Sequence, residues 1–298
     1  MTIMADSLPT EGQGIRLILG EPVQRDFFYV YHGNIIHSEG GPQTLYVMDH
    51  VFWGRILFLN GTLQFTTRDE FIYHEALVHI PVQSRPEKSI KKVLICGGGD
   101  FGAARELLKY QDIEKIIIAD IDPRVPEVVK KFFPELLPEN KEDPRLELLI
   151  TDAYKLVADL VEKEEVFDLV IIDSTDPDVA PEGSTIELSH SLFSPHFHEL
   201  LKRLAPEGLV VQQAATPFTM KNVLEWTYRT FVEVYGPEEV YCYRADIPSF
   251  GGDNAYLLRA PEEPTKPRRE LTVPTKYYTH ALHTASFSLP KFWTEVLK

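Results

Sequence analysis

Strand-like patterns dominate the start of the chain. Between residues 15 and 67, apolar positions fall in runs rich in β-branched and aromatic residues, and polar turn residues separate the runs. The Asn60-Gly61 pair between two such runs is a strong signal of a β-hairpin. We therefore expect an N-terminal antiparallel β-domain over residues 1–67. A helix follows from about Arg68 to Pro81, and its expected buried positions are Phe71, Ile72, Leu77 and Val78.

Strand-like and helix-like segments alternate over the next part of the chain. The expected strands are 92–96, 115–119, 146–150, 168–172, 209–213, 240–244 and 255–259. The expected helices are 102–110, 123–133, 153–162, 195–204 and 221–234. This alternation predicts a mostly parallel sheet with helices on both faces, and the last two strands predict an antiparallel edge because no helix separates them.

These patterns define an expected fold. The chain is predicted to be an α/β protein with a seven-stranded, Rossmann-like sheet of the methyltransferase type over residues 68–298. The small β-domain precedes this larger domain. The C-terminal tail is rich in aromatic residues, so we expect it to pack against the body of the domain.

The loop after the first strand of this sheet has the composition of a ligand-binding turn. Gly97, Gly99 and Gly102 have the spacing of a nucleotide-binding turn, where the backbone bends sharply and a ligand approaches closely. Asp100 within the turn would repel a pyrophosphate at the helix N-terminus and would attract an amine. The turn therefore favours an adenosine-like ligand with a positively charged tail over a dinucleotide.

Acidic residues follow four neighbouring strands, at the edge where open α/β sheets bind ligands. Asp120 lies about twenty residues after the glycines, where an acid commonly binds ribose hydroxyls. Asp152 is either an acceptor for an adenine amino group or the N-cap of the next helix. Asp173 and Asp176 are close enough to raise each other's proton affinity, so one could be a base while the other holds a cation. Together with Asp100, these acids predict a site for a polycationic ligand.

The charge and the apolar content of the chain limit the kinds of molecule that the protein is expected to bind. The 298 residues carry a formal net charge of −15, which disfavours nucleic acid and attracts cationic small molecules. No apolar run is long enough to span a bilayer, and the first residues lack the pattern of a secretion signal, so we expect a cytoplasmic protein without a membrane partner. Cys96 and Cys242 lie in apolar runs and are expected to be buried thiols.

A metal site is not expected from the histidines. His196 and His198 form an H-x-H pair, but no third ligand has the spacing of a zinc site. We therefore predict that both lie on the surface of a helix and that the protein holds no metal.

Four motifs, in this order, resemble the polyamine aminopropyltransferases, the spermidine synthase family. They are RDEFIYHEALVH at 68–79, the GGGD turn at 97–100, DSTDP at 173–177 and ASFSLP near the C-terminus. The similarity extends from about residue 15 to the tail. It implies transfer of the aminopropyl group of decarboxylated S-adenosylmethionine to an amine, with release of 5′-methylthioadenosine. The donor is then a co-substrate, no permanently bound cofactor is implied, and a homodimer or homotetramer is expected.

The resemblance also implies roles for individual residues. Asp173 would be the proton acceptor, because an amine with a pKa of about 10 must lose a proton before it attacks. The residues expected to contact the donor are Gln43, Gly97, Gly99, Asp100, Asp120, Asp152, Ala153 and Pro181. Those expected to hold the aminopropyl amine or the acceptor are Tyr73, His74, Asp100, Asp176, Gln213 and Phe250.

Departures from the family pattern bear on the donor and the acceptor. Phe101 replaces a glycine of many members, so it either crowds the donor side or packs under the sheet. The loop after Pro177 is longer than usual and is expected to gate the acceptor. Phe250 stands where a tyrosine holds a putrescine-type diamine, and Asp120 stands where glutamate is more usual, which resembles the thermospermine synthase branch. We therefore favour spermidine as acceptor, with putrescine, agmatine or a similar diamine as the alternative.

Three rival functions are weighed against this prediction. A small-molecule methyltransferase on the same fold would place the carboxylate of intact S-adenosylmethionine against Asp100. A non-catalytic polyamine-binding protein would not need both Asp173 and Asp176. A dinucleotide oxidoreductase is disfavoured by Asp100 in the glycine turn.

Overall fold

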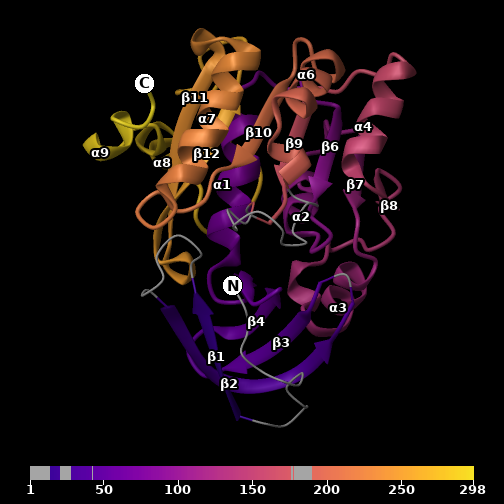
Figure 1. The fold of residues 1–298 in the computed structure, drawn as a ribbon. Helices are drawn as coiled ribbons and strands as arrows, with labels where there is room; N and C mark the ends of the chain where they lie inside the picture. Colours follow the sequence, from indigo (N-terminus) through magenta and orange to yellow (C-terminus); the bar gives the residue numbers. More distant parts are fainter. Residues whose placement is uncertain (1–13, 21–27, 42, 176, 178–189) are drawn as a thin grey trace.

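The computed structural model of the chain describes residues 14–20, 28–41, 43–175, 177 and 190–298. A five-stranded sheet of N-terminal strands lies below a seven-stranded sheet in the view of Figure 1, and helix α1 (Glu70–Gln83) lies next to both. Side chains of α1 and of both sheets share one apolar core. The predicted division into two domains near residue 67 is consistent with this arrangement and stays a prediction.

The N-terminal sheet is antiparallel, and its strands follow the chain in order. They are β1 (Gly14–Gly20), β2 (Phe28–Glu39), β3 (Leu45–His50), β4 (Gly54–Leu59) and β5 (Thr62–Thr66). Asn60 and Gly61 join β4 to β5 with φ angles of 51° and 77°. Positive φ at both central residues is the requirement of the hairpin turn that an Asn-Gly pair favours, so the predicted hairpin is confirmed.

The larger sheet has the predicted mixed topology. Its strands are β6 (Lys92–Gly97), β7 (Lys115–Asp120), β8 (Leu146–Ile150), β9 (Leu169–Asp173), β10 (Leu209–Gln213), β11 (Val240–Ile247) and β12 (Gly252–Arg259). Their order is β11-β12-β10-β9-β6-β7-β8, with β6 to β10 parallel and β11 and β12 antiparallel at one edge. The strand order reverses between β6 and β9, which is where open α/β sheets bind their ligands.

Helices cover both faces of this sheet, because alternate strand residues point to opposite sides. The α-helices after α1 are α2 (Gly102–Leu108), α3 (Arg124–Phe132), α4 (Ala153–Glu162), α6 (Pro195–Leu204), α7 (Lys221–Tyr235), α8 (His280–Ser286) and α9 (Lys291–Thr294). The 3-10 turns are η1 (Pro134–Leu136), η2 (Ser191–Phe193), η3 (Pro237–Glu239) and η4 (Pro248–Phe250). Val93 and Ile95 of β6 pack in one core with α1, α2 and α3, whereas Leu94 and Cys96 pack in the other with α4, α6 and α7.

Helix α1 differs from its prediction in the face that it buries. Leu77 and Val78 are buried as expected, but Phe71 and Ile72 are only half-buried. The helix packs against both sheets, so it has no wide solvent-facing side and also buries polar residues. These are Glu70, His74, Glu75, His79 and Gln83. The prediction that Phe71 and Ile72 in the first turn of this helix are buried was therefore wrong.

His198 corrects a second expectation. His196 is exposed on α6, but His198 is fully buried, and its ring nitrogens lie 3.0 Å from Gln212 Oε1 and 3.1 Å from Tyr235 Oη. Burial lowers the pKa of His198 to about 3, so the ring is neutral. The residue belongs to the apolar stripe of α6 and not to its surface.

The C-terminal tail packs against the body, as predicted, and one carboxylate holds its start. Glu75 of α1 is buried and accepts hydrogen bonds from the backbone N–H groups of Lys276, Tyr277 and Tyr278, at 2.7–2.8 Å. Trp293 near the end of the tail is also buried. Cys96 and Cys242 are buried free thiols, as expected. Among the described residues, no helix has the length and apolarity needed to cross a membrane.

Replacing Glu75 tests this attachment. Glu75→Ala leaves three backbone N–H donors without their acceptor, one of them buried, and we expect it to lower the free energy of unfolding by about 3 kcal/mol. Urea denaturation measures this loss, and limited proteolysis should release the tail. Glu295→Ala, on an exposed residue of the same tail, is the control. Equal stability of the two variants would contradict the assigned role.

Candidate active site

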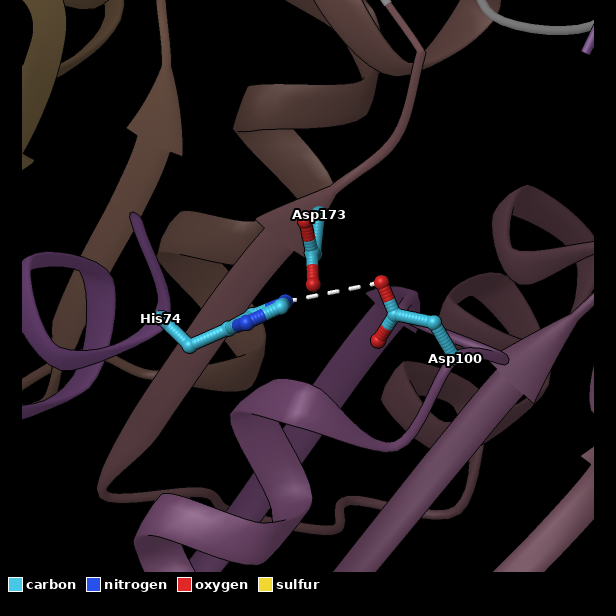
Figure 2. A group of neighbouring side chains, drawn as sticks. All are labelled: His74, Asp100 and Asp173. Carbon is cyan, nitrogen blue, oxygen red and sulfur yellow. Dashed lines mark ion pairs between the residues drawn. The ribbon is translucent and has the colours of Figure 1, made fainter. Parts of the chain in front are cut away.

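Three charged side chains meet beside the carboxyl ends of β6 and β9. His74 comes from α1, Asp100 from the glycine turn and Asp173 from the end of β9. Figure 2 shows the three side chains pointing toward one another. One ring nitrogen of His74 and one carboxylate oxygen of each aspartate lie within 4.8 Å of one another. The structure therefore brings together three residues that the sequence placed in one site.

Each glycine of the turn packs against one of the predicted site residues. A Cβ atom on Gly97, whose φ is +86°, would lie 2.1 Å from the backbone oxygen of Asp173. A Cβ on Gly99 would lie 2.5 Å from a carboxylate oxygen of Asp120, and one on Gly102 would lie 2.2 Å from the ring of His74. The glycines thus serve to bring the acids and the histidine close to the turn.

One oxygen of the Asp173 carboxylate accepts a hydrogen bond, and the other has no partner among the described residues. Tyr73 Oη donates to Asp173 Oδ1 at 2.7 Å. Oδ2 is shielded from solvent and has no hydrogen-bond partner among the described residues. Burial and the nearby Asp100 raise the pKa of Asp173 to about 7, although the positive charge of His74 opposes this rise. A carboxyl group of this kind can take up and release a proton near neutral pH.

His74 provides a cation among these acids. Its Nδ1 lies 2.7 Å from Glu70 Oε2, and its Nε2 lies 3.4 Å from Asp100 Oδ2. Burial alone would lower the pKa of His74, but the two carboxylates outweigh burial and raise it to about 10, so the ring is an imidazolium. The sequence analysis did not identify Glu70 as a site residue, although its position four residues before His74 places it on the same face of a helix.

Asp120 and Asp152 lie at the ends of the next two strands. Asp120 accepts hydrogen bonds from the backbone N–H of Gly99 at 2.8 Å and of Asp122 at 2.9 Å. Asp152 accepts from the backbone N–H of Tyr154 at 2.9 Å, so it caps α4 as one of the two alternatives predicted. This cap uses one carboxylate oxygen, and a role of Asp152 toward a ligand stays a prediction.

Gln43 reaches this region from the N-terminal sheet. Its Nε2 donates to Asp122 Oδ2 at 3.0 Å. Arg124 also binds the Asp122 carboxylate, and its guanidinium donates to the backbone oxygens of Gly40 and Gln43, each at 2.9 Å. Arg124, which the sequence analysis did not single out, thereby anchors Gln43 beside the end of β7.

The remaining predicted residues have more varied positions. Ala153 is buried at the first turn of α4, and the Nε2 of Gln213 donates to the backbone oxygen of Ser174 at 3.0 Å. The ring centroid of Phe250 lies 5.8 Å from that of Tyr73. Asp176 and Pro181 lie outside the described residues, and so does most of the loop predicted to gate the acceptor. Mutual coupling of Asp173 and Asp176 therefore stays a prediction.

Phe101 adopts the second of its two predicted alternatives. It is 5% exposed and lies in the apolar core beneath the sheet, so it does not crowd the turn. Its φ angle of 68° is one that glycine adopts easily. Burial of the ring, roughly 1.5–3 kcal/mol, offsets the cost of about 1–2 kcal/mol for this conformation.

The strand order, the glycine turn and the acids at the strand ends together define an enzyme of the methyltransferase-like class. Comparison with known proteins makes this more specific. Residues 70–265 match the family model described as the spermine/spermidine synthase domain. The chain belongs to this family, and the predicted family, fold class and transferase activity class are confirmed.

Relatives of known name agree with this assignment. A polyamine aminopropyltransferase of Clostridium tetani is 38% identical over 89% of this chain and 90% of its own length. One from Thermoanaerobacter sp. (strain X514) is 36% identical over 85% of this chain and 88% of its own length. A crystal structure of spermidine synthase in complex with the transition state analogue AdoDATO superposes with a TM-score of 0.83 at 28% identity, covering 99% of this chain and 98% of that one.

The contact between Gly102 and His74 can be tested directly. Gly102→Ala introduces a methyl group into the space of the His74 ring, and we expect a loss of about 1–3 kcal/mol in stability. The loss should be much smaller when the ring is absent, that is, between His74→Ala and the double variant. Denaturation of all four proteins measures the cycle, and an equal loss in both backgrounds would contradict the packing.

Proposed function

We propose that this chain transfers the aminopropyl group of decarboxylated S-adenosylmethionine to a polyamine and that Asp173 accepts the proton of the attacking amine. The observation that carries this proposal is Oδ2 of Asp173, which is shielded from solvent and has no hydrogen-bond partner among the described residues, on a carboxyl group whose pKa is about 7. Family membership supports the reaction, as does the binding of AdoDATO, a transition state analogue, by a spermidine synthase of this fold.

The reaction requires one proton transfer and one displacement. The acceptor amine arrives protonated, with a pKa of about 10, and gives a proton to Asp173 Oδ2. Its nitrogen lone pair then attacks the carbon next to the sulfonium, the C–S bond breaks, and the bonding electrons neutralise the sulfur of the departing methylthioadenosine. Tyr73 keeps its proton, because burial and Asp173 raise its pKa well above 10, and it orients Oδ1.

The donor fits the ends of β7 and β8. In this proposal Asp120 accepts the ribose hydroxyls, and Asp152 and Ala153 contact the adenine. Ile121 and Ile150 at these strand ends are 44% and 47% exposed, which provides apolar surface for a planar base. Asp100 then faces the aminopropyl amine. The same position would repel the carboxylate of intact S-adenosylmethionine, so a methyltransferase is the weaker alternative.

The acceptor side is proposed to favour spermidine. Phe250 packs near Tyr73 and offers no hydroxyl to the distal amine of a short diamine. A longer acceptor can place its methylene groups on this ring. We also propose that the enzyme works in the cytoplasm as a homodimer or homotetramer, which the two buried free thiols and the exposed Val51 and Phe52 of the β3–β4 turn suit.

An amine panel tests the reaction and the acceptor together. The decarboxylated donor is offered with spermidine, putrescine, agmatine and cadaverine, and release of methylthioadenosine is measured. We expect the highest kcat/KM with spermidine and a shift toward putrescine in Phe250→Tyr, which supplies a hydroxyl. If no methylthioadenosine is released with any of the four amines, aminopropyl transfer is contradicted. Methylation by intact S-adenosylmethionine would support the methyltransferase.

Asp173→Asn tests the base. The variant should bind the donor as the wild type does but should turn over at least about 100-fold more slowly, because an amide cannot accept the proton. In the wild type, kcat/KM should rise as pH increases through about 7, since Asp173 must lose its proton to act. Asp246→Asn, on an exposed acid, is the control. Unchanged turnover in Asp173→Asn would refute the assigned role.

A further inference from the structure

Glu70 is a buried carboxylate that, among the described residues, contacts the site through His74. Its side chain is 4% exposed, and its Oε2 lies 2.7 Å from Nδ1 of His74, one helical turn later on α1. On its other side the guanidinium of Arg105 donates to both carboxylate oxygens, at 3.0 and 2.9 Å. Burial alone would raise the pKa of Glu70, but His74 and the bidentate Arg105 pair outweigh it and lower the pKa to about 2. Glu70 is therefore ionised at every pH at which the enzyme works.

An ionised acceptor on Nδ1 determines the state of the ring. It fixes a proton on Nδ1 and the orientation of the imidazole, so that Nε2 faces the open part of the site. Asp100 Oδ2 is 3.4 Å from Nε2, and Asp173 lies in the same cluster. The titratable groups that face His74 from the elements around it are Glu70 and Tyr73 of α1, Asp100 of the glycine turn, Asp173 of β9 and, through Glu70, Arg105 of α2.

We infer that Glu70 is a positioning residue whose carboxylate holds the His74 ring as a cation facing Asp100 and Asp173. The inference rests on the proposed function, in which Asp173 must release its proton near neutral pH. Burial and Asp100 both favour the protonated acid, and His74 supplies the nearby positive charge that opposes them. Without Glu70 the ring loses its proton more easily, and Asp173 then retains its own proton to higher pH.

The protonation state of His74 can be followed without turnover. We expect the imidazole NMR signals of His74 in the wild type to remain those of an imidazolium past pH 8.5, since the pKa is about 10. The signals are assigned by their loss in His74→Gln. In Glu70→Gln, removal of one of the two carboxylates should lower the midpoint of the His74 titration by about 1–3 pH units. Glu70→Asp keeps the charge and should restore most of the shift.

A matched control separates this role from the loss of a buried ion pair. Glu106 is also buried, binds the same Arg105 at 3.0 Å and contacts His79 instead of His74. Glu106→Gln should lower the stability as Glu70→Gln does, because each removes one buried carboxylate beside Arg105. It should leave the midpoint of His74 where it is in the wild type.

Activity provides the second readout. Because kcat/KM reports the free enzyme, its acid limb follows Asp173. We expect this limb to move to higher pH in Glu70→Gln by an amount that increases as the titration midpoint of His74 falls toward 7, and to stay in place in Glu106→Gln.

Three results would overturn the inference. They are a midpoint of His74 near 6.5 in the wild type, no shift in Glu70→Gln, or an equal shift in Glu106→Gln. A shift of His74 in an enzyme that transfers no aminopropyl group would instead contradict the proposed function and leave the Glu70–His74 contact supported.

Discussion

The burial of the Asp173 carboxyl group is the constraint on which the rest of the site depends. A carboxylate removed from water is costly unless neighbours compensate it, and here the compensation is partial. Tyr73 satisfies one oxygen and His74 supplies a nearby positive charge, while Asp100 adds a negative one. The balance keeps the proton affinity near neutrality. Weaker compensation would leave a permanently protonated acid, and stronger compensation would leave a poor base.

The fold provides this balance through close approach of backbones. β6 and β9 are neighbouring parallel strands, so the glycine turn and Asp173 emerge side by side at the point where the strand order reverses. Only the absence of side chains at Gly97 and Gly102 allows Asp173 and His74 to come so near the turn. Helix α1 can carry the buried His74 and Glu70 because Arg105 of the next helix pairs with Glu70. The acids of the cleft and the polar side of α1 are thus parts of one charge arrangement.

Periodic patterns allowed most of the fold to be predicted, but they failed where burial is not one-sided. The strands of the large sheet were correct to within a few residues, because runs such as 93–96 are apolar at every position and alternate with helical segments. Phe71, Ile72 and His198 were misplaced, since a pattern does not show that a second layer covers the other side of a helix. Asp100 and Asp173 were found as strand-end acids. Glu70 acts through His74, four residues later on the same helix, whereas Arg124 acts through Gly40 and Gln43, which lie far away in the sequence.

The arrangement of charges also bears on how the proposed enzyme selects its donor. The acids at the strand ends are not equivalent. Asp100, Asp120 and Asp152 each accept a hydrogen bond from a backbone N–H group. Asp100 and Asp173 in addition lie beside the imidazolium of His74. A donor amine entering between them meets two carboxylates and one fixed cation, which is a net attraction. A donor that also carried a carboxylate would place it against Asp100 at short range, where Coulomb repulsion in a partly buried site is several-fold stronger than in water. In the proposed function, discrimination between the decarboxylated and the intact donor therefore needs no steric barrier, because the charge of Asp100 in the glycine turn provides it.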